Sequence, residues 1–437
     1  MLSISARLTT CVHPRYGNAV KATEYFINRA GDILHNEMYE PTLERIQAFF
    51  LLGVSEWIQG NRNRSAIHMG IAVRMANMLH LHREESYKIP ENATTKEIIE
   101  SESARRTFWI LESQEHLYIE YNGAVAFPLS DISALLPSSE EEFAFGKVPE
   151  VRSALAGTEA ANKNPDLASL PSRTLFATVV QAHNLWGQVA RRAGRVARSE
   201  HEKADEVINK PWERKSNYLQ LTQTLRDWEK SLPAQHHWSV WNFRGYKATF
   251  LERPYVSQVI VTRLSNIIIR RIYLDDILDF VLGRLRSDCP DPKFWSNMAF
   301  ELYSNVRDLH DTFDTVCSLR LEGEDYPAIL VFSIYICGSL AAYLFKWPQL
   351  CPLLASSAEP ILNRSLEILG MLLPNWPIIQ RWLDALQRIA SPMRSQSQEE
   401  EQGLGGLNTY HFEPGLSFPS ASPHPDGDLH PLPLRLN

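Results

Sequence analysis

Apolar residues in this chain recur three and four positions apart, a spacing that places them on one side of an α-helix. The clearest stripe of apolar and small residues consists of Ile46, Phe49, Phe50, Gly53, Val54 and Trp57. Pro41 precedes this stripe, as is common at helix starts. Alternation of apolar and polar residues, the pattern of a half-buried strand, is absent or short. The sequence therefore predicts an all-α fold, a large multi-helix domain.

The same periodicity predicts the other helices. We expect them over residues 63–81, 95–121, 175–198, 218–232, 255–285 and 291–321, followed by two final helices that end near residue 389. Residues 326–345 carry no charge, and the run is long enough to span a membrane. Its serine, cysteine, glycine and tyrosine residues, and the lack of a second such run, favour a buried core helix. We therefore expect no membrane partner.

Composition divides the chain into one domain and a tail. We expect residues 1–390 to form a single helical domain, because a chain of 437 residues is able to bury a large core. Residues 137–172 start with acidic residues and are then rich in Ala, Asn, Ser and Pro, which predicts an exposed, partly disordered loop. Residues 391–437 are rich in Ser, Gln, Glu, Gly and Pro, which predicts a disordered tail.

Charge and cysteine usage exclude several functions. The net charge of −7 opposes a broad surface for duplex DNA, because phosphates are neutralised by basic residues. The five cysteines are Cys11, Cys289, Cys317, Cys337 and Cys351. None of them is close enough to another to begin a zinc site, and their scatter favours a reducing compartment. No secretory signal is evident, since Arg7 and polar residues interrupt the first segment.

Three aspartates form the strongest enzyme-like pattern in the chain: Asp275, Asp276 and Asp279. On a helix, this spacing brings carboxylates to one face, where they are able to hold magnesium ions. The pattern resembles the aspartate-rich motif of class I terpene cyclases. Those enzymes need a second metal motif, and the candidates that start at Asn305 and Asn363 lack its residues. We expect a solvated helix face, and a magnesium-dependent, terpene-cyclase-like helical enzyme is the alternative.

Basic residues and histidines give two weaker patterns. Arg191, Arg192, Arg195 and Arg198 make a basic helical segment, which favours a solvated surface over an import signal or a contact for acidic partners. The histidine pairs lack the spacing or the number of ligands that a metal needs. We therefore expect no catalytic, cofactor-binding, metal-binding or DNA-binding residue in this chain.

Four motifs follow one another between residues 70 and 137. They are Gly70-Ile-Ala-Val-Arg-Met-Ala76, Leu79-His-Leu-His-Arg-Glu84, Glu102-x-x-Arg105-Arg106-x-Phe108-Trp109, and Asp131-Ile132 with Leu136-Pro137. Their order resembles the fungal-specific transcription factor domain, the middle homology region of binuclear zinc cluster regulators. The resemblance covers about residues 2–386 and departs from the family pattern at His80, which replaces a glycine, and at Asn122-Gly123-Ala124, which replaces Gly-Arg-Pro.

The resemblance implies a nuclear regulator of genes transcribed by RNA polymerase II, in a metabolic or biosynthetic pathway, and not an enzyme. It implies that Glu102, Arg105, Arg106, Phe108 and Trp109 form a packing and ion-pair signature with a structural role. The zinc of the family belongs to an N-terminal six-cysteine cluster that this chain lacks, so no cofactor is expected here.

The resemblance implies three kinds of partner: other regulators, a second copy of the chain and a small-molecule effector. It implies contact with DNA only indirectly, or through a missing N-terminal module. Truncation and action without a DNA contact of its own both remain open. A protein-interaction scaffold that binds no DNA is a further alternative.

Overall fold

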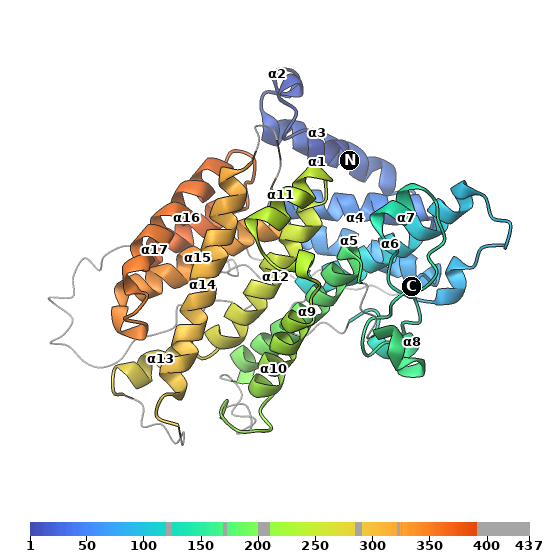
Figure 1. The fold of residues 1–437 in the computed structure, drawn as a ribbon. Coiled ribbons are helices and arrows are strands. Elements are labelled where there is room, and N and C mark those ends of the chain that lie inside the picture. Colours follow the sequence, from blue (N-terminus) through green and yellow to red (C-terminus); the bar gives the residue numbers. More distant parts are fainter. Residues whose placement is uncertain are drawn as a thin grey trace, which may run out of the picture.

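The computed structural model describes residues 1–118, 125–168, 173–199, 210–284, 291–320, 324 and 326–390. Every regular element among these residues is a helix, which confirms the all-α prediction (Figure 1). The predicted tail, residues 391–437, and the end of the helix predicted over 95–121 lie outside the described residues.

The helices follow the predicted order with small shifts of their ends. The first nine are α1 (Leu2–Ser5), α2 (His13–Tyr16), α3 (Ala19–Leu34), α4 (Leu43–Ile58), α5 (Arg62–Met78), α6 (Thr95–Tyr118), α7 (Glu140–Ala144), α8 (Glu159–Lys163) and α9 (Leu175–Ser199). The others are α10 (Asn217–Lys230), α11 (Val240–Ala248), α12 (Glu252–Arg271), α13 (Leu274–Val281), α14 (Phe294–Ser318), α15 (Ala328–Lys346), α16 (Ala358–Leu372) and α17 (Ile379–Ala390). The single helix predicted over 255–285 is two helices, α12 and α13. Helices α1 to α3, α7, α8 and α11 were not predicted.

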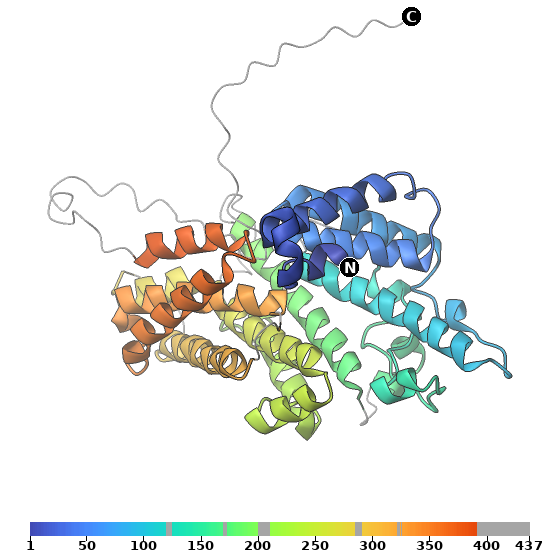
Figure 2. The ribbon, with the colours of Figure 1, turned by 90° about the horizontal axis from the view of Figure 1, so that it is seen from above.

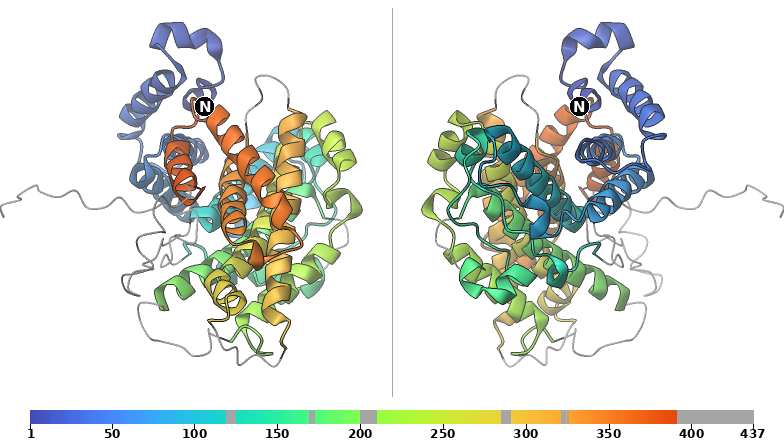
Figure 3. Two further views of the ribbon diagram at one scale, coloured as in Figure 1. Left: turned by 90° about the vertical axis from the view of Figure 1, so that its left-hand side faces the viewer. Right: turned by 90° about the vertical axis from the view of Figure 1, so that its right-hand side faces the viewer.

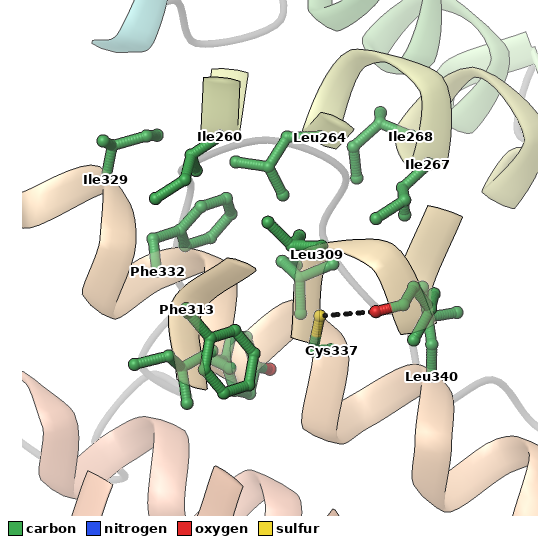
Figure 4. Close-up of a cluster of buried hydrophobic side chains, with 14 of the residues drawn as sticks. Ile260, Leu264, Ile267, Ile268, Leu309, Phe313, Ile329, Phe332, Cys337 and Leu340 are labelled. Carbon is green, nitrogen blue, oxygen red and sulfur yellow. Dashed lines mark hydrogen bonds between the residues drawn. The ribbon is translucent and has the colours of Figure 1, made fainter. Parts of the chain in front are cut away.

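The larger hydrophobic core surrounds α12, α14 and α15. Figure 4 shows Leu264 of α12, Phe313 of α14 and Phe332 of α15 pointing into this core. Helix α15 is long and apolar enough to cross a membrane, but 83% of its most apolar stretch is buried inside the protein. The prediction that this charge-free run is a core helix is therefore confirmed.

A smaller core lies between α4, α5, α6 and the segment that follows α6. Three helices, α4, α6 and α9, contribute buried side chains to both cores. The N-terminal helices also contact the C-terminal ones, as Figures 2 and 3 show. Trp57 of α4 packs edge-on against Trp376 and Trp382, with ring centroids 6.4 and 6.3 Å apart. Arg7 donates a hydrogen bond to the carbonyl of Asn375 over 3.2 Å.

Of the segment predicted as an exposed, partly disordered loop over 137–172, the structure describes residues 137–168, which combine exposed side chains such as Phe145 and Val151 with buried ones. Residues 169–172 lie outside the described part of the chain. This segment contains α7 and α8, and Ala154 and Thr158 are fully buried. Backbone hydrogen bonds fix it, from the amide of Ala154 to the carbonyl of Leu167 and from the amide of Glu159 to the carbonyl of Ile132, both 2.9 Å. Small residues that are typical of loops here permit close packing.

Helix α5 ends in a Schellman motif whose left-handed residue is His80. The amide of His80 donates to the carbonyl of Asn77, and the amide of Leu81 donates to the carbonyl of Ala76. His80 has a φ of 53°, a conformation that favours glycine because a side chain there crowds the backbone. The resemblance implies a glycine at this position, which is the residue that this geometry favours.

We predict that His80→Gly stabilises the protein by about 1 kcal/mol, because it removes the strain of a left-handed side chain. The matched change is Gly146→Ala, at a glycine with a φ of 58°. A Cβ atom there would lie 2.4 Å from Cγ2 of Thr95, so this variant should lose stability. Urea unfolding of both variants measures the effects. A His80→Gly protein less stable than the wild type would contradict the prediction.

Helices α6 and α9 approach each other closely at Gly187. A Cβ atom on Gly187 would lie 2.3 Å from Nδ1 of His116, so only glycine fits. His183 lies one turn earlier on α9, is buried, and its Nδ1 is 2.8 Å from the carbonyl oxygen of Val179. Burial lowers the pKa of His183 to about 4.

We predict that the protein loses stability as the pH falls from about 6.5 towards 4. His183 takes up a proton near pH 6.5 in the unfolded chain but stays neutral in the folded one, which costs about 2 kcal/mol at pH 5. Urea unfolding at pH 7 and pH 5 measures this loss. It should be smaller in His183→Gln, and equal losses in the two proteins would contradict the assignment to His183.

Candidate functional site

Glu102 on α6 is the centre of a buried ion-pair cluster. Its side chain is only 3% exposed and lies among three arginines. Its carboxylate is 2.7 Å from Nη2 of Arg152, 3.2 Å from Nε of Arg106 and 3.8 Å from Nε of Arg105. The amide of Ser138 also donates to it, over 2.9 Å. A carboxylate buried this deeply is stable only when its charge is compensated on several sides.

Arg105 joins α6 to the segment that follows α5. Its two terminal nitrogens lie 2.6 and 2.7 Å from the two carboxylate oxygens of Glu84, a bidentate pair. Its guanidinium lies over the ring of Tyr87, 4.1 Å from the centroid. It also donates to the carbonyl of Leu135, and the amide of Leu135 donates to Glu84 over 2.7 Å. The backbone at Leu135 is therefore fixed through both its amide and its carbonyl group.

Arg106 joins α6 to the start of α7. It pairs with Glu140 over 2.7 Å and donates to the carbonyl of Ser138 over 2.9 Å. Its guanidinium lies 4.3 Å from the ring centroid of Phe143 and 5.2 Å from that of Phe176. Arginine is suited to this position, because its planar group stacks on rings while its edge donates hydrogen bonds.

The aromatic pair on α6 completes the same attachment. Trp109 is fully buried, and its Nε1 donates to the carbonyl of Leu135 over 2.9 Å. Phe108 is also fully buried and packs edge-on against Trp109 and Phe127, with centroids 5.1 and 5.2 Å apart. The five residues predicted as the signature thus lie together on α6.

Sequence reasoning missed three members of this cluster: Glu84, Glu140 and Arg152. The sequence contains a weak indication of Glu84, which ends one of the quoted motifs, and of Glu140, which lies in the acidic run. It contains no indication that Arg152 belongs to the cluster. Burial is the largest cause that lowers the pKa of Arg152, and repulsion from Arg105 adds to it. We call these three residues, together with Glu102, Arg105 and Arg106, the Glu102 clamp. Its geometry attaches residues 132–152 to α6.

The three aspartates of the enzyme-like pattern lie on α13. Leu274 and Ile277 of this helix are buried, whereas Asp275 and Asp276 are exposed. Asp279 is 3.9 Å from Arg284. Within the described part of the chain, no three His, Cys, Asp or Glu side chains are arranged to hold a metal ion. The spacing of the aspartates there matches the outer face of an amphipathic helix.

The prediction of a solvated basic surface on α9 is wrong for Arg192. This side chain is buried and donates to the hydroxyl of Tyr273. Arg191 is half-buried, with Nη1 3.4 Å from Nδ1 of His116. Arg192 thus joins α9 to the residue that precedes α13, and Arg191 joins α9 to α6, because their long side chains reach polar atoms inside the interface. The side chains of Arg195 and Arg198 lie outside the described part of the structure.

We predict that Glu102→Gln lowers the free energy of unfolding by about 3–5 kcal/mol, because it removes the buried negative charge that Arg105, Arg106 and Arg152 share. The matched variant is Glu140→Gln, in the same cluster but 41% exposed. It should cost less than about 1 kcal/mol. Chemical denaturation of both variants measures the difference. Equal losses would show that burial of the charge is not what makes the clamp important.

Comparison with known proteins gives a family and several relatives. The fungal specific transcription factor domain matches residues 2–229, which include the whole Glu102 clamp. An uncharacterized transcriptional regulatory protein of Schizosaccharomyces pombe is 24% identical over 84% of this chain and 45% of its own length. A second such protein of that yeast is 23% identical over 54% of this chain and 35% of its own length.

A third relative is the Zn(2)-C6 fungal-type transcription factor FTF1c of Fusarium oxysporum, which is 25% identical over 51% of this chain and 24% of its own length. The chain therefore spans less than half the length of these curated relatives. No solved structure matches it significantly. Since the family match covers more than half of the residues, this chain belongs to the family of fungal transcription regulators that carry the fungal specific transcription factor domain.

Proposed function

We propose that this chain acts in the nucleus as a regulatory domain for genes transcribed by RNA polymerase II. The observation that carries the proposal is the family match over residues 2–229. The Glu102 clamp supports it, because its charged groups pair with one another and leave no nucleophile or acid free for catalysis. A regulatory domain needs a fixed shape that partners recognise, and buried ion pairs give the segment after α6 one arrangement.

We propose that DNA is read by a module or a partner outside this sequence. The net charge of −7 supports this, as does the scatter of the five cysteines, two of which, Cys337 and Cys351, are buried. One relative is named a Zn(2)-C6 transcription factor, and a zinc cluster of that kind is one candidate for the missing module. Another regulator, or a second copy of this chain, is the other.

Fusion to a heterologous DNA-binding module tests the regulatory role. The chain, joined to such a module and expressed in a fungal reporter strain, should change transcription severalfold relative to the module alone. Glu140→Gln should keep this effect. Glu102→Gln should lose it together with the folded protein, which immunoblotting and limited proteolysis follow.

A folded, nuclear fusion that leaves transcription unchanged would contradict the proposal. If that fusion still captured a protein partner, the alternative of an interaction scaffold would take its place. A tagged chain without the fused module should collect in the nucleus, alone or with its partner, and a cytosolic distribution would contradict that part of the proposal.

A further inference from the structure

A cleft opens where the ends of four helices meet, away from the Glu102 clamp. It is lined by α11, the first turns of α12, the last residues of α14 and the start of α15. Figure 1 shows α11 beside α12 at this end of the larger core. The cleft holds about 450 Å³, its open mouth included.

One wall of the cleft is apolar. Phe243 of α11, Val256 of α12 and Val316 of α14 line it, and all three are buried from solvent. Pro327, at the start of α15, extends this wall. A ligand that fills the cleft therefore needs an apolar part of its own, since a fully polar molecule would lose its water here without compensation.

One charged pair in the cleft is already compensated. The ammonium group of Lys247 is 2.9 Å from the carboxylate of Glu324 and donates to the carbonyl of Leu319 over 2.8 Å. Together these two side chains contribute no net charge. The recognition of a ligand therefore depends on the three other charged residues of the lining.

Those residues, Glu252, Arg253 and Arg320, form no ion pair with any described residue. The guanidinium of Arg320 lies 4.4 Å from the ring centroid of Tyr326, a contact that leaves its edge free to donate. Oε2 of Glu252 is buried and has no hydrogen-bond partner among the described side chains and backbone. A buried carboxylate oxygen without a donor costs free energy, which a ligand would recover by supplying one.

We propose that this cleft binds an α-amino acid with an apolar side chain. The ligand carboxylate pairs with Arg320 and Arg253, its ammonium group donates to Glu252, and its side chain packs against Phe243 and its apolar neighbours. A purely cationic ligand would meet two guanidinium groups, and a dicarboxylate would meet Glu252. The zwitterion satisfies all three groups with charge-assisted hydrogen bonds. This binding is independent of the transcriptional role proposed above.

Thermal unfolding and calorimetry of the purified chain test the proposal, with L-leucine and L-phenylalanine as probes. Each should bind in the millimolar range or tighter and raise the melting temperature in proportion to the logarithm of its concentration. Phenethylamine, which lacks the carboxylate, and 3-phenyllactate, which carries a hydroxyl in place of the ammonium group, should each bind at least about tenfold more weakly than phenylalanine.

Variants locate the site. Arg320→Met and Arg253→Met should each weaken binding about tenfold or more, and because Arg253 is exposed, its replacement leaves the fold intact. The matched control is Arg244→Met, on α11 but outside the cleft, where the guanidinium lies over Trp241. It should bind as the wild type does.

Three results would overturn the proposal: no shift with either amino acid, binding of phenethylamine or phenyllactate equal to that of phenylalanine, or binding that survives both replacements in the cleft. The melting temperature of each variant without ligand shows whether it is folded. Failure of this test leaves the reporter experiment unaffected, because that experiment supplies no ligand and measures transcription alone.

Discussion

The burial of Glu102 is the constraint on which the arrangement of residues 84–152 depends. Moving a carboxylate out of water is costly, so it must be met by opposite charge and hydrogen bonds from several directions. Those partners come from α6 itself, from the segment before α7 and from Arg152, which lies between α7 and α8. The chain satisfies all of them only when residues 132–152 lie against α6. The clamp thus selects one path for a segment whose composition alone would allow many.

Helix α6 connects the clamp to the rest of the domain, because it packs into both hydrophobic cores. Phe108 and Trp109 belong to the smaller core, whereas Leu117, near the end of the same helix, belongs to the larger one. Its contact with α9 is close because Gly187 leaves room for His116. Helix α9 packs in turn along α12, whose first turn lines the cleft. The clamp and the cleft therefore lie at two ends of one continuous series of packed helices.

The spacing of residues along the sequence predicted those features that depend only on near neighbours in the chain. The apolar stripe of α4 and the pairing of Glu102 with Arg106 follow from helical spacing, and both are present. The role of Arg152 could not be predicted, because the path of the chain after α6 decides which carboxylate it meets. The burial of Ala154, Thr158 and Arg192 gave no signal for a related reason. Composition reports the average behaviour of residue types, whereas these positions depend on which neighbours the fold provides. The break between α12 and α13 gave no signal, because Tyr273 and its neighbours continue the apolar pattern.

The clamp and the cleft differ in how their charges are satisfied, and this difference separates structural from binding roles. In the clamp, each carboxylate lies within ion-pair distance of an arginine, and aromatic rings cover two of the guanidinium groups. Oε2 of Glu102 and Nε of Arg105 have no hydrogen-bond partner in the described part of the chain, but the charges of both side chains are paired, so a charged ligand would have to break ion pairs to bind. In the cleft, Arg253, Arg320 and Glu252 have no ionic partner among the described residues, although a neutral Lys247–Glu324 pair lies beside them. A protein tolerates this cost most easily where a molecule from outside completes the network. For that reason we assign ligand binding to the cleft and a structural role to the clamp.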